Sequence, residues 1–331
     1  MRVYVSSDRG GFNNDETEVT GSLEIDGHVL APINGLSPVT LVGTPFITAR
    51  RRDLIDRSQT DHTLNFRIPA ALAEGSKDLA IVVEAPTEAG SPSAGRTSSW
   101  EWSDHGTLRI RYVRVRTTDT DVPGGSLEPT DAEARFTIER AVDLLPTPDT
   151  DIAPARVPIH ETTLDYRSEN RTPPGQRVDV QNELSDLHDC RLTEWLDTVD
   201  EPCPAEDRAI WVGIVRNSIG GVARSSLATA LSSWYRVTDL QASGRRIVTA
   251  HEIGHALGLG HTDTGAGSPS RPDPHPNGGF LSDVPFDPFW NTTVAAPVAD
   301  VMSYDAPRWV SAHNWNRLLP EILRRSDATN V

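Results

Sequence analysis

The feature that most constrains this chain is the spacing of three histidines and one glutamate in residues 251–261, HEIGHALGLGH. On a helix, His251 and His255 lie one turn apart on the same face, so both rings can reach one metal ion. Glu252 is rotated by about 100° from His251, so its carboxylate flanks the metal instead of binding it. The segment therefore predicts an active-site helix that supplies two metal ligands.

Two glycines after this helix indicate how a third ligand reaches the same ion. Gly258 and Gly260 can adopt the positive φ angles that end helices and turn the chain sharply, which returns His261 towards the metal. Three imidazole nitrogens leave the fourth position of a tetrahedral zinc site open, which is typical of catalytic zinc. The full pattern HExxHxxGxxH arises by chance on the order of once in ten thousand chains of this length. We therefore predict that the three histidines bind zinc.

A second motif lies downstream at residues 300–304, DVMSY, and Met302 is one of only two methionines in the chain. A zinc-binding helix followed by a methionine-containing turn resembles the metzincin superfamily of zinc peptidases. The sequence Met-Ser-Tyr is most similar to the turns of serralysin-type and astacin-type members. The resemblance implies that Met302 forms an apolar floor beneath the histidines and that Tyr304 approaches the zinc or the reaction intermediate.

The resemblance also implies an activity, that of a zinc metalloendopeptidase acting on protein or peptide substrates. We expect zinc to lower the pKa of its bound water to about 7, and Glu252 to pass a proton from that water to the leaving amine. Tyr304 is expected to donate a hydrogen bond to the oxyanion. An adhesin or binding module with a structural zinc site is the alternative, although such a scaffold needs no base at Glu252. A hydrolase of non-peptide amides is a second alternative.

Length and charge limit the architecture and the partners. The 331 residues suggest about two domains, and the formal net charge is −16. This charge disfavours nucleic acid and anionic membranes as partners, because their phosphates would be repelled. No apolar run approaches the roughly 18 residues of a membrane span. The first residues, MRVYVSSD, lack the apolar core of a secretory signal, and a secreted, extracellular location is expected from the resemblance alone.

Residues 1–105 predict an accessory β-sandwich domain of the immunoglobulin or fibronectin type III kind. Asp26-Gly27 stands between apolar runs in residues 22–30, which predicts a hairpin with a type I′ turn. Apolar residues alternate over 63–68 and run continuously over 79–83, as strands require. An antiparallel sandwich follows. Such a domain could bind a glycan or a cell-surface ligand, could bind substrate, or could act as a spacer.

Residues 106–331 predict a metzincin-like zinc metalloprotease domain, so the expected fold class is an all-β sandwich followed by an α/β (α+β) zincin domain with a mixed sheet. The predicted strand over 107–117 changes its apolar phase between Tyr112 and Val113. Such a strand either serves two environments or carries a β-bulge. A capping box, Thr130 to Glu133, predicts the start of a helix.

Two further predictions concern the strands of this domain. Arg109, Arg111, Arg114 and Arg116 alternate along one strand, and we interpret them as a solvated or ion-paired face. The metzincin resemblance implies an edge strand near residues 221–230 that pairs with an extended substrate through backbone hydrogen bonds.

The polar loop between His261 and the second motif contains four aspartates, Asp263, Asp273, Asp283 and Asp287. A structural calcium ion could pin such a loop, but no EF-hand spacing is present and a plain rim loop is favoured.

The two cysteines and the histidines outside the motif are not assigned to the predicted active site. A disulfide between Cys190 and Cys203 would stabilise the fold by about 3 kcal/mol, and in an extracellular protein we favour this bridge over two free thiols. Histidines outside the motif, including His275, have no partner at ligand spacing and are assigned no role.

Overall fold

In the computed structural model, the chain forms two compact units. Unit 1 comprises residues 1–104 and 282–298, and unit 2 comprises residues 105–281 and 299–331. Residues 282–298 thus pack with the first unit, although they follow the zinc motif in sequence. The structure describes residues 1–4, 16–33, 47–49, 63–85, 90, 93–102, 106–118, 126–147, 149–162, 174–189, 209–216, 222–224, 229–233, 246–262, 273–287, 292–294 and 297–326.

Unit 1 is built from antiparallel strands. The main sheet has the order β3-β2-β6-β7, with β4 also paired to β2, while β1 pairs with β5 and β14 pairs with β15. A short 3₁₀ helix covers Ala70–Leu72. The strands are β1 (Arg2–Tyr4), β2 (Glu16–Ile25), β3 (His28–Leu30), β4 (Ile47–Ala49), β5 (Thr63–Asn65), β6 (Gly75–Glu84), β7 (Ser93–Trp102), β14 (Phe286–Asp287) and β15 (Thr292–Thr293).

The predicted hairpin in unit 1 is confirmed. Ile25 pairs with His28, and the two residues between them have positive φ angles, 46° at Asp26 and 83° at Gly27. Positive φ at both central positions defines a type I′ turn, whose twist matches that of the flanking strands. Alternate residues of β2, such as Leu23 and Ile25, are fully buried and contribute to the core of this unit. The immunoglobulin or fibronectin kind of sandwich stays a prediction.

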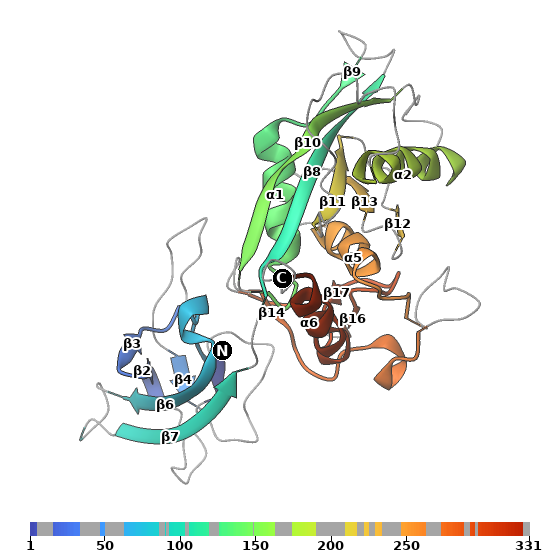
Figure 1. Cartoon of the computed structure of the whole chain (residues 1–331). Coiled ribbons are helices and arrows are strands. Elements are labelled where there is room, and N and C mark those ends of the chain that lie inside the picture. The colour runs from blue at the N-terminus through green and yellow to red at the C-terminus, as the bar shows by residue number, and fades with distance from the viewer. Residues whose placement is uncertain are drawn as a thin grey trace. The chain divides into compact units, whose positions relative to one another are not determined.

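Unit 2 contains a six-stranded sheet of order β10-β8-β11-β13-β12, with β9 paired to β8. Strands β10, β8, β11 and β13 are parallel, whereas β12 and β9 run antiparallel to their partners (Figure 1). A short parallel pair, β16 with β17, lies apart from this sheet. The elements are β8 (Leu108–Thr118), β9 (Ser126–Leu127), α1 (Asp131–Val142), β10 (Thr150–Thr162), α2 (Pro174–His188), β11 (Ile210–Val215), β12 (Val222–Arg224), β13 (Thr229–Ser233), α5 (Arg246–Ala256), a 3₁₀ helix (Pro276–Gly279), β16 (Ala299–Asp300), β17 (Arg308–Trp309) and α6 (Ala312–Ser326).

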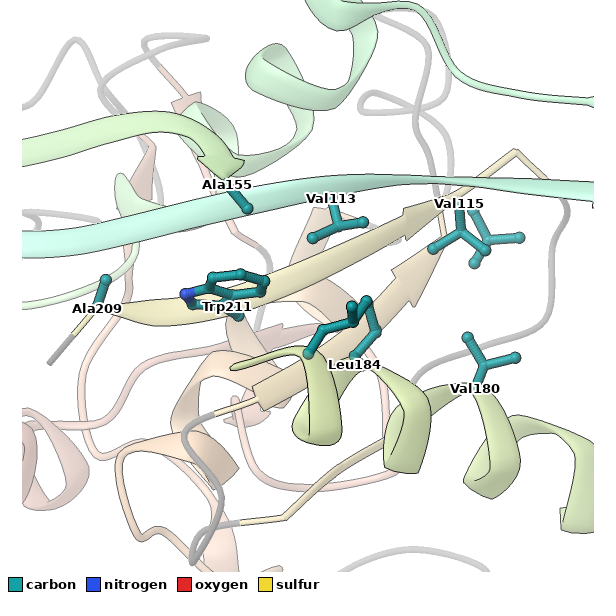
Figure 2. Close-up of a cluster of buried hydrophobic side chains, with 9 residues drawn as sticks. Val113, Val115, Ala155, Val180, Leu184, Ala209 and Trp211 are labelled. Carbon is teal, nitrogen blue, oxygen red and sulfur yellow. The ribbon is translucent and has the colours of Figure 1, made fainter. Parts of the chain in front are cut away.

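Strand β8 serves two environments, as its apolar phase predicted. Val113 and Val115 are fully buried on the face covered by α2, where they pack with Leu184 and Trp211 (Figure 2). Tyr112 lies on the opposite face, where its hydroxyl donates a 2.8 Å hydrogen bond to Asp131 at the start of α1. Helices α1 and α2 therefore cover opposite faces of the sheet, each over a different half of β8.

The bulge that the phase change also allowed occurs in the neighbouring strand. The register of β10 against β8 shifts between Pro154 and Ile159, whereas β8 pairs with β11 without interruption from Ile110 to Val115. A bulge inserts extra residues on one strand only, so β10 absorbs the irregularity and β8 stays regular.

Three of the four arginines of β8 are ion-paired. Arg111 contacts Asp151 at 2.8 Å, and Arg114 and Arg116 both contact Glu128, at 2.9 and 2.7 Å. The predicted ion pairing is confirmed for these three side chains, but they do not form one face. Arg111 shares the face of Val113, whereas Arg114 and Arg116 share the face of Tyr112.

The predicted start of α1 is also confirmed. The Glu133 amide donates to Thr130 Oγ1 at 3.3 Å, and the Thr130 amide donates to Glu133 Oε2 at 2.8 Å, which completes a capping box. Helix α1 then packs against α5 and places its buried residues Ala134, Ile138 and Ala141 in the interior. None of the described helices has the length and hydropathy that a bilayer-crossing segment needs.

Candidate metal centre

Helix α5 carries the first two histidines of the motif and ends directly after the second. The Leu259 amide donates to the Gly254 carbonyl and the Gly258 amide to the His255 carbonyl, both at 2.9 Å. With Gly258 at a φ of 93°, this pattern is a Schellman motif. The predicted positive φ at Gly258 is confirmed, and the turn brings His261 back to the helix.

The prediction for Gly260 is wrong in its reason. Among the described glycines with positive φ, Gly258 is present but Gly260 is not. A Cβ atom on Gly260 would instead lie 2.7 Å from Asp273 Oδ2, so only glycine leaves room for this carboxylate. The small residue at this position permits a close contact, not an unusual backbone angle.

The three histidines converge through their Nε2 atoms. The distances are 3.1 Å between His251 and His255, 3.2 Å between His251 and His261, and 3.0 Å between His255 and His261. Three nitrogens bound at about 2.05 Å in a tetrahedral zinc site are about 3.3 Å apart. The triangle is thus close to the spacing that one zinc ion requires, and the donor set fits this metal.

Backbone carbonyls fix the orientation of two of these rings. His251 Nδ1 donates to the Val301 carbonyl and His255 Nδ1 to the Leu259 carbonyl, both at 2.8 Å. Since a carbonyl only accepts, each Nδ1 carries the proton and each Nε2 keeps its lone pair. This arrangement is the outer shell that metal-binding histidines usually have.

Burial keeps the histidines in their neutral, ligating form. Burial, aided by the charge of His255, lowers the pKa of His251 to about 3, and the same two causes lower the pKa of His261 to about 4. Burial also lowers the pKa of His255, against the opposing effect of its hydrogen bond to Leu259. At neutral pH all three imidazoles are therefore uncharged and able to bind a metal cation.

Of the two predicted catalytic residues, Tyr304 contacts this triangle, and Glu252 is next to it in sequence. Glu252 follows His251 on α5 and is 5% exposed. Tyr304 is half exposed, and its hydroxyl lies 2.9 Å from His261 Nε2, with the two rings 4.6 Å apart. The tyrosine hydroxyl is thus within hydrogen-bond distance of the histidine cluster.

Met302 packs against α5 at Gly254, and its predicted role as a floor beneath the histidines stays a prediction. Its side chain is fully buried, and a Cβ atom added to Gly254 would lie 2.7 Å from Met302 Sδ. The Thr262 amide donates to the Met302 carbonyl at 3.3 Å, which ties the turn to the residue after the third histidine. Gly254 is therefore a site residue that the sequence did not single out.

Asp300 is the main residue whose role was missed. Its side chain is fully buried and accepts hydrogen bonds from the amides of Met302 and Ser311, at 2.8 and 2.9 Å, and from Asn314 Nδ2 at 2.7 Å. His275, which had no assigned role, is next to this carboxylate and 2.9 Å from Ser311 Oγ. An acidic residue directly before an apolar turn was the available signal, because a carboxylate there can accept the turn's amides.

The other candidate ligands do not gather in one place. Asp273 belongs to unit 2, whereas Asp283 and Asp287 belong to unit 1. Within the described ranges, His251, His255 and His261 form the only group of three or more such side chains that could hold a metal ion. Asp263, Cys190 and Cys203 lie outside the described residues. The calcium ion and the disulfide stay predictions.

Comparisons with known proteins identify no family or relative for this chain. The chain matches no model of a known protein family, and no curated protein is similar to it in sequence.

Proposed function

We propose that this chain is a zinc-dependent endopeptidase of the metzincin type, with His251, His255 and His261 as the metal ligands. The observation that carries the proposal is the triangle of Nε2 atoms, 3.0–3.2 Å apart, in which backbone carbonyls orient the rings of His251 and His255. A zinc ion in such a site supplies Lewis-acid chemistry, polarising a carbonyl and favouring the deprotonated form of water near neutral pH.

Glu252 is the proposed general base. Its carboxylate accepts a proton from the attacking water as the new C–O bond forms, and it delivers this proton to the amine nitrogen as the C–N bond breaks. Its low exposure supports this role, because a dry environment strengthens proton transfer between fixed groups. Tyr304 has its hydroxyl near His261 and would donate a hydrogen bond to the carbonyl oxygen as negative charge builds there.

The edge of the six-stranded sheet supports an extended peptide as the substrate. Among the described strands, β12 pairs only with β13 and ends the sheet. Helix α5 contacts both β12 and β13, so this edge belongs to the same part of unit 2 as the histidines. Backbone groups along β12 could pair with a substrate strand, which requires no special side chains.

The proposal extends to the rest of the protein through the family resemblance. A secreted enzyme would carry unit 1 as an immunoglobulin-like or fibronectin-like accessory domain for a glycan, a cell-surface ligand or substrate. The antiparallel strands and separate hydrophobic core of unit 1 support this part of the proposal.

The test is cleavage of unfolded casein by the wild-type protein and by Glu252→Gln, each with its zinc content measured. We expect chelator-sensitive cleavage by the wild type and a loss of several orders of magnitude in the variant at equal zinc, because the variant keeps the ligands but lacks the base. Glu139→Gln, which changes an exposed carboxylate on α1, is the matched control and should cleave normally.

Two outcomes would contradict the proposal. Near-normal cleavage by Glu252→Gln would remove this residue from the mechanism. Zinc bound at the histidines without cleavage by the wild type would favour the binding module with a structural zinc site.

A further inference from the structure

We propose that Arg317 and Asn314 of helix α6 are positioning residues. They fix the position of His261 relative to the turn that contains Met302. The two residues are three positions apart on α6 and so lie one turn apart on the same face. The inference rests on the metal site of the proposed function and assigns the C-terminal helix to that site.

Asp273 is the link between α6 and the third histidine. Its carboxylate accepts a hydrogen bond from the Gly260 amide at 2.8 Å, and its own amide donates to the His261 carbonyl at 2.7 Å. These two hydrogen bonds fix the backbone before and after the Gly260–His261 peptide bond, at the Gly260 amide and the His261 carbonyl. Asp273 thereby closes the loop that follows His261 at its base, and it fixes the direction from which the third ring approaches.

Arg317 connects Asp273 to a second group of hydrogen bonds, formed by Asn314 and Asp300. Its Nη2 donates to Asp273 Oδ2 at 3.0 Å, and its Nη1 donates to Asn314 Oδ1 at 3.3 Å. Asn314 in turn donates through Nδ2 to Asp300 Oδ1 at 2.7 Å. A planar guanidinium suits this double role, because its donors point in fixed directions.

The chain of hydrogen bonds ends at the methionine turn. Asp300 Oδ1 accepts the Met302 amide at 2.8 Å, so the same carboxylate oxygen joins the turn to Asn314. One continuous series therefore runs from the Gly260 amide through Asp273, Arg317, Asn314 and Asp300 to the Met302 amide. The third metal ligand and the floor beneath the metal are placed by one helix.

The solvent exposure of the Arg317–Asp273 ion pair indicates that it positions the site more than it stabilises the fold. The side chains of Arg317 and Asp273 are 37% and 32% exposed, and ion pairs with this much solvent contact contribute little to folding stability. Removal of outer groups that orient metal ligands typically weakens metal binding by 10- to 100-fold. Loss of Arg317 should therefore change zinc affinity much more than it changes stability.

The experiment compares zinc affinity in full-length variants, measured by competition with a chromophoric chelator. We expect Arg317→Gln to bind zinc about tenfold more weakly than the wild type, at the low end of that range because the contact is indirect. Arg324→Gln is the matched control, because Arg324 is an arginine of the same helix that pairs with Glu321, one turn away. Arg317→Lys should recover part of the affinity, since lysine can reach one of the two partners.

Thermal unfolding of the metal-free variants completes the test, and the midpoint of Arg317→Gln should match that of Arg324→Gln. Equal zinc affinities in these two variants, or a fall in metal-free stability that parallels the fall in affinity, would overturn the inference. Wild-type protein that binds zinc but does not cleave casein would overturn the proposed activity alone. Wild-type protein that binds no zinc would overturn both.

Discussion

Gly254 is the residue whose small size the candidate site requires most directly. A Cβ atom there would lie 2.7 Å from Met302 Sδ and 3.5 Å from Leu259 Cδ1. Alanine favours a helix over glycine by about 1 kcal/mol, whereas overpacking a core costs about 1–3 kcal/mol. We expect Gly254→Ala to lower the free energy of unfolding by about 1 kcal/mol, measured by urea denaturation of the metal-free protein.

The background variant Met302→Ala tests whether this contact is the cause. It removes the sulfur that the new methyl group would meet, so Gly254→Ala should be neutral or stabilising in that background. An equal loss in both backgrounds would show that the methionine is not responsible.

Asp300 should make the stability of unit 2 depend on pH. Burial raises the pKa of this carboxyl, but hydrogen bonds from His275, Ser311 and the Met302 amide outweigh burial and hold the pKa below its ordinary value. A pKa that is lower in the folded state gives stability above the unfolded value, near pH 3.9, and this stability is lost as pH falls through the folded value.

Asp300→Asn provides the measurement. The variant turns an amide donor towards groups that also donate, so we expect a loss of about 3 kcal/mol at pH 7. The gap between wild type and variant, followed by urea denaturation of metal-free protein, should narrow below pH 4. A gap that stays constant from pH 7 to pH 3 would argue against a charged Asp300.

At this scale the sequence predicted contacts between near neighbours and missed distant ones. His251, His255 and His261 lie within one motif, so helix geometry and a turn suffice to bring them together. Asp273 meets a partner 44 residues away in Arg317, and no local pattern specifies that contact. Gly260 illustrates the same limit. Its contact with Asp273 lies beyond the local turn, so the sequence predicted only a backbone reason for this glycine.

Among the elements, α1 packs against α5, which carries His251 and His255, and its start depends on its cap. Thr130→Ala removes the oxygen that accepts the Glu133 amide, and such changes cost about 1 kcal/mol. We expect this loss in urea denaturation, with zinc affinity unchanged because the cap is remote from the histidines. Thr130→Ser keeps the hydroxyl and should stay within a few tenths of a kcal/mol of the wild type. A serine variant as unstable as the alanine variant would assign the effect to the methyl group instead.

Strand β8 shows what periodicity can predict about an element. The phase change between Tyr112 and Val113 indicated two environments, and the strand is indeed buried by different helices on its two faces. The bulge lies in β10. Periodicity could not predict this, because it indicates which face of a strand is buried but not which neighbouring strand carries the extra residues.

For the whole molecule, residues 282–298 are the feature that sequence did not predict. Their assignment to unit 1 depends on contacts with residues far earlier in the chain, which no local sequence pattern specifies. A fragment of residues 1–104 should therefore be less stable than the same fragment joined to residues 282–298 by a glycine-serine linker. We expect the joined fragment to unfold at a higher urea concentration, because residues 282–298 contact unit 1.

A scrambled version of residues 282–298 on the same linker is the control for this comparison. It should give no more stability than the fragment of residues 1–104 alone. Equal stabilisation by the native and scrambled segments would mean that these residues do not pack specifically with unit 1.

The divided unit 1 has a consequence for the order of events on the ribosome. Domains usually fold from the N-terminus as the chain emerges, but unit 1 is not complete until Val298 has been made. Helix α5 leaves the ribosome earlier than this, whereas Met302 and all of α6 leave later. In the proposed enzyme, a nascent chain would carry its histidines without the parts that position them. Proteolytic activity would then appear only after α6 has left the ribosome.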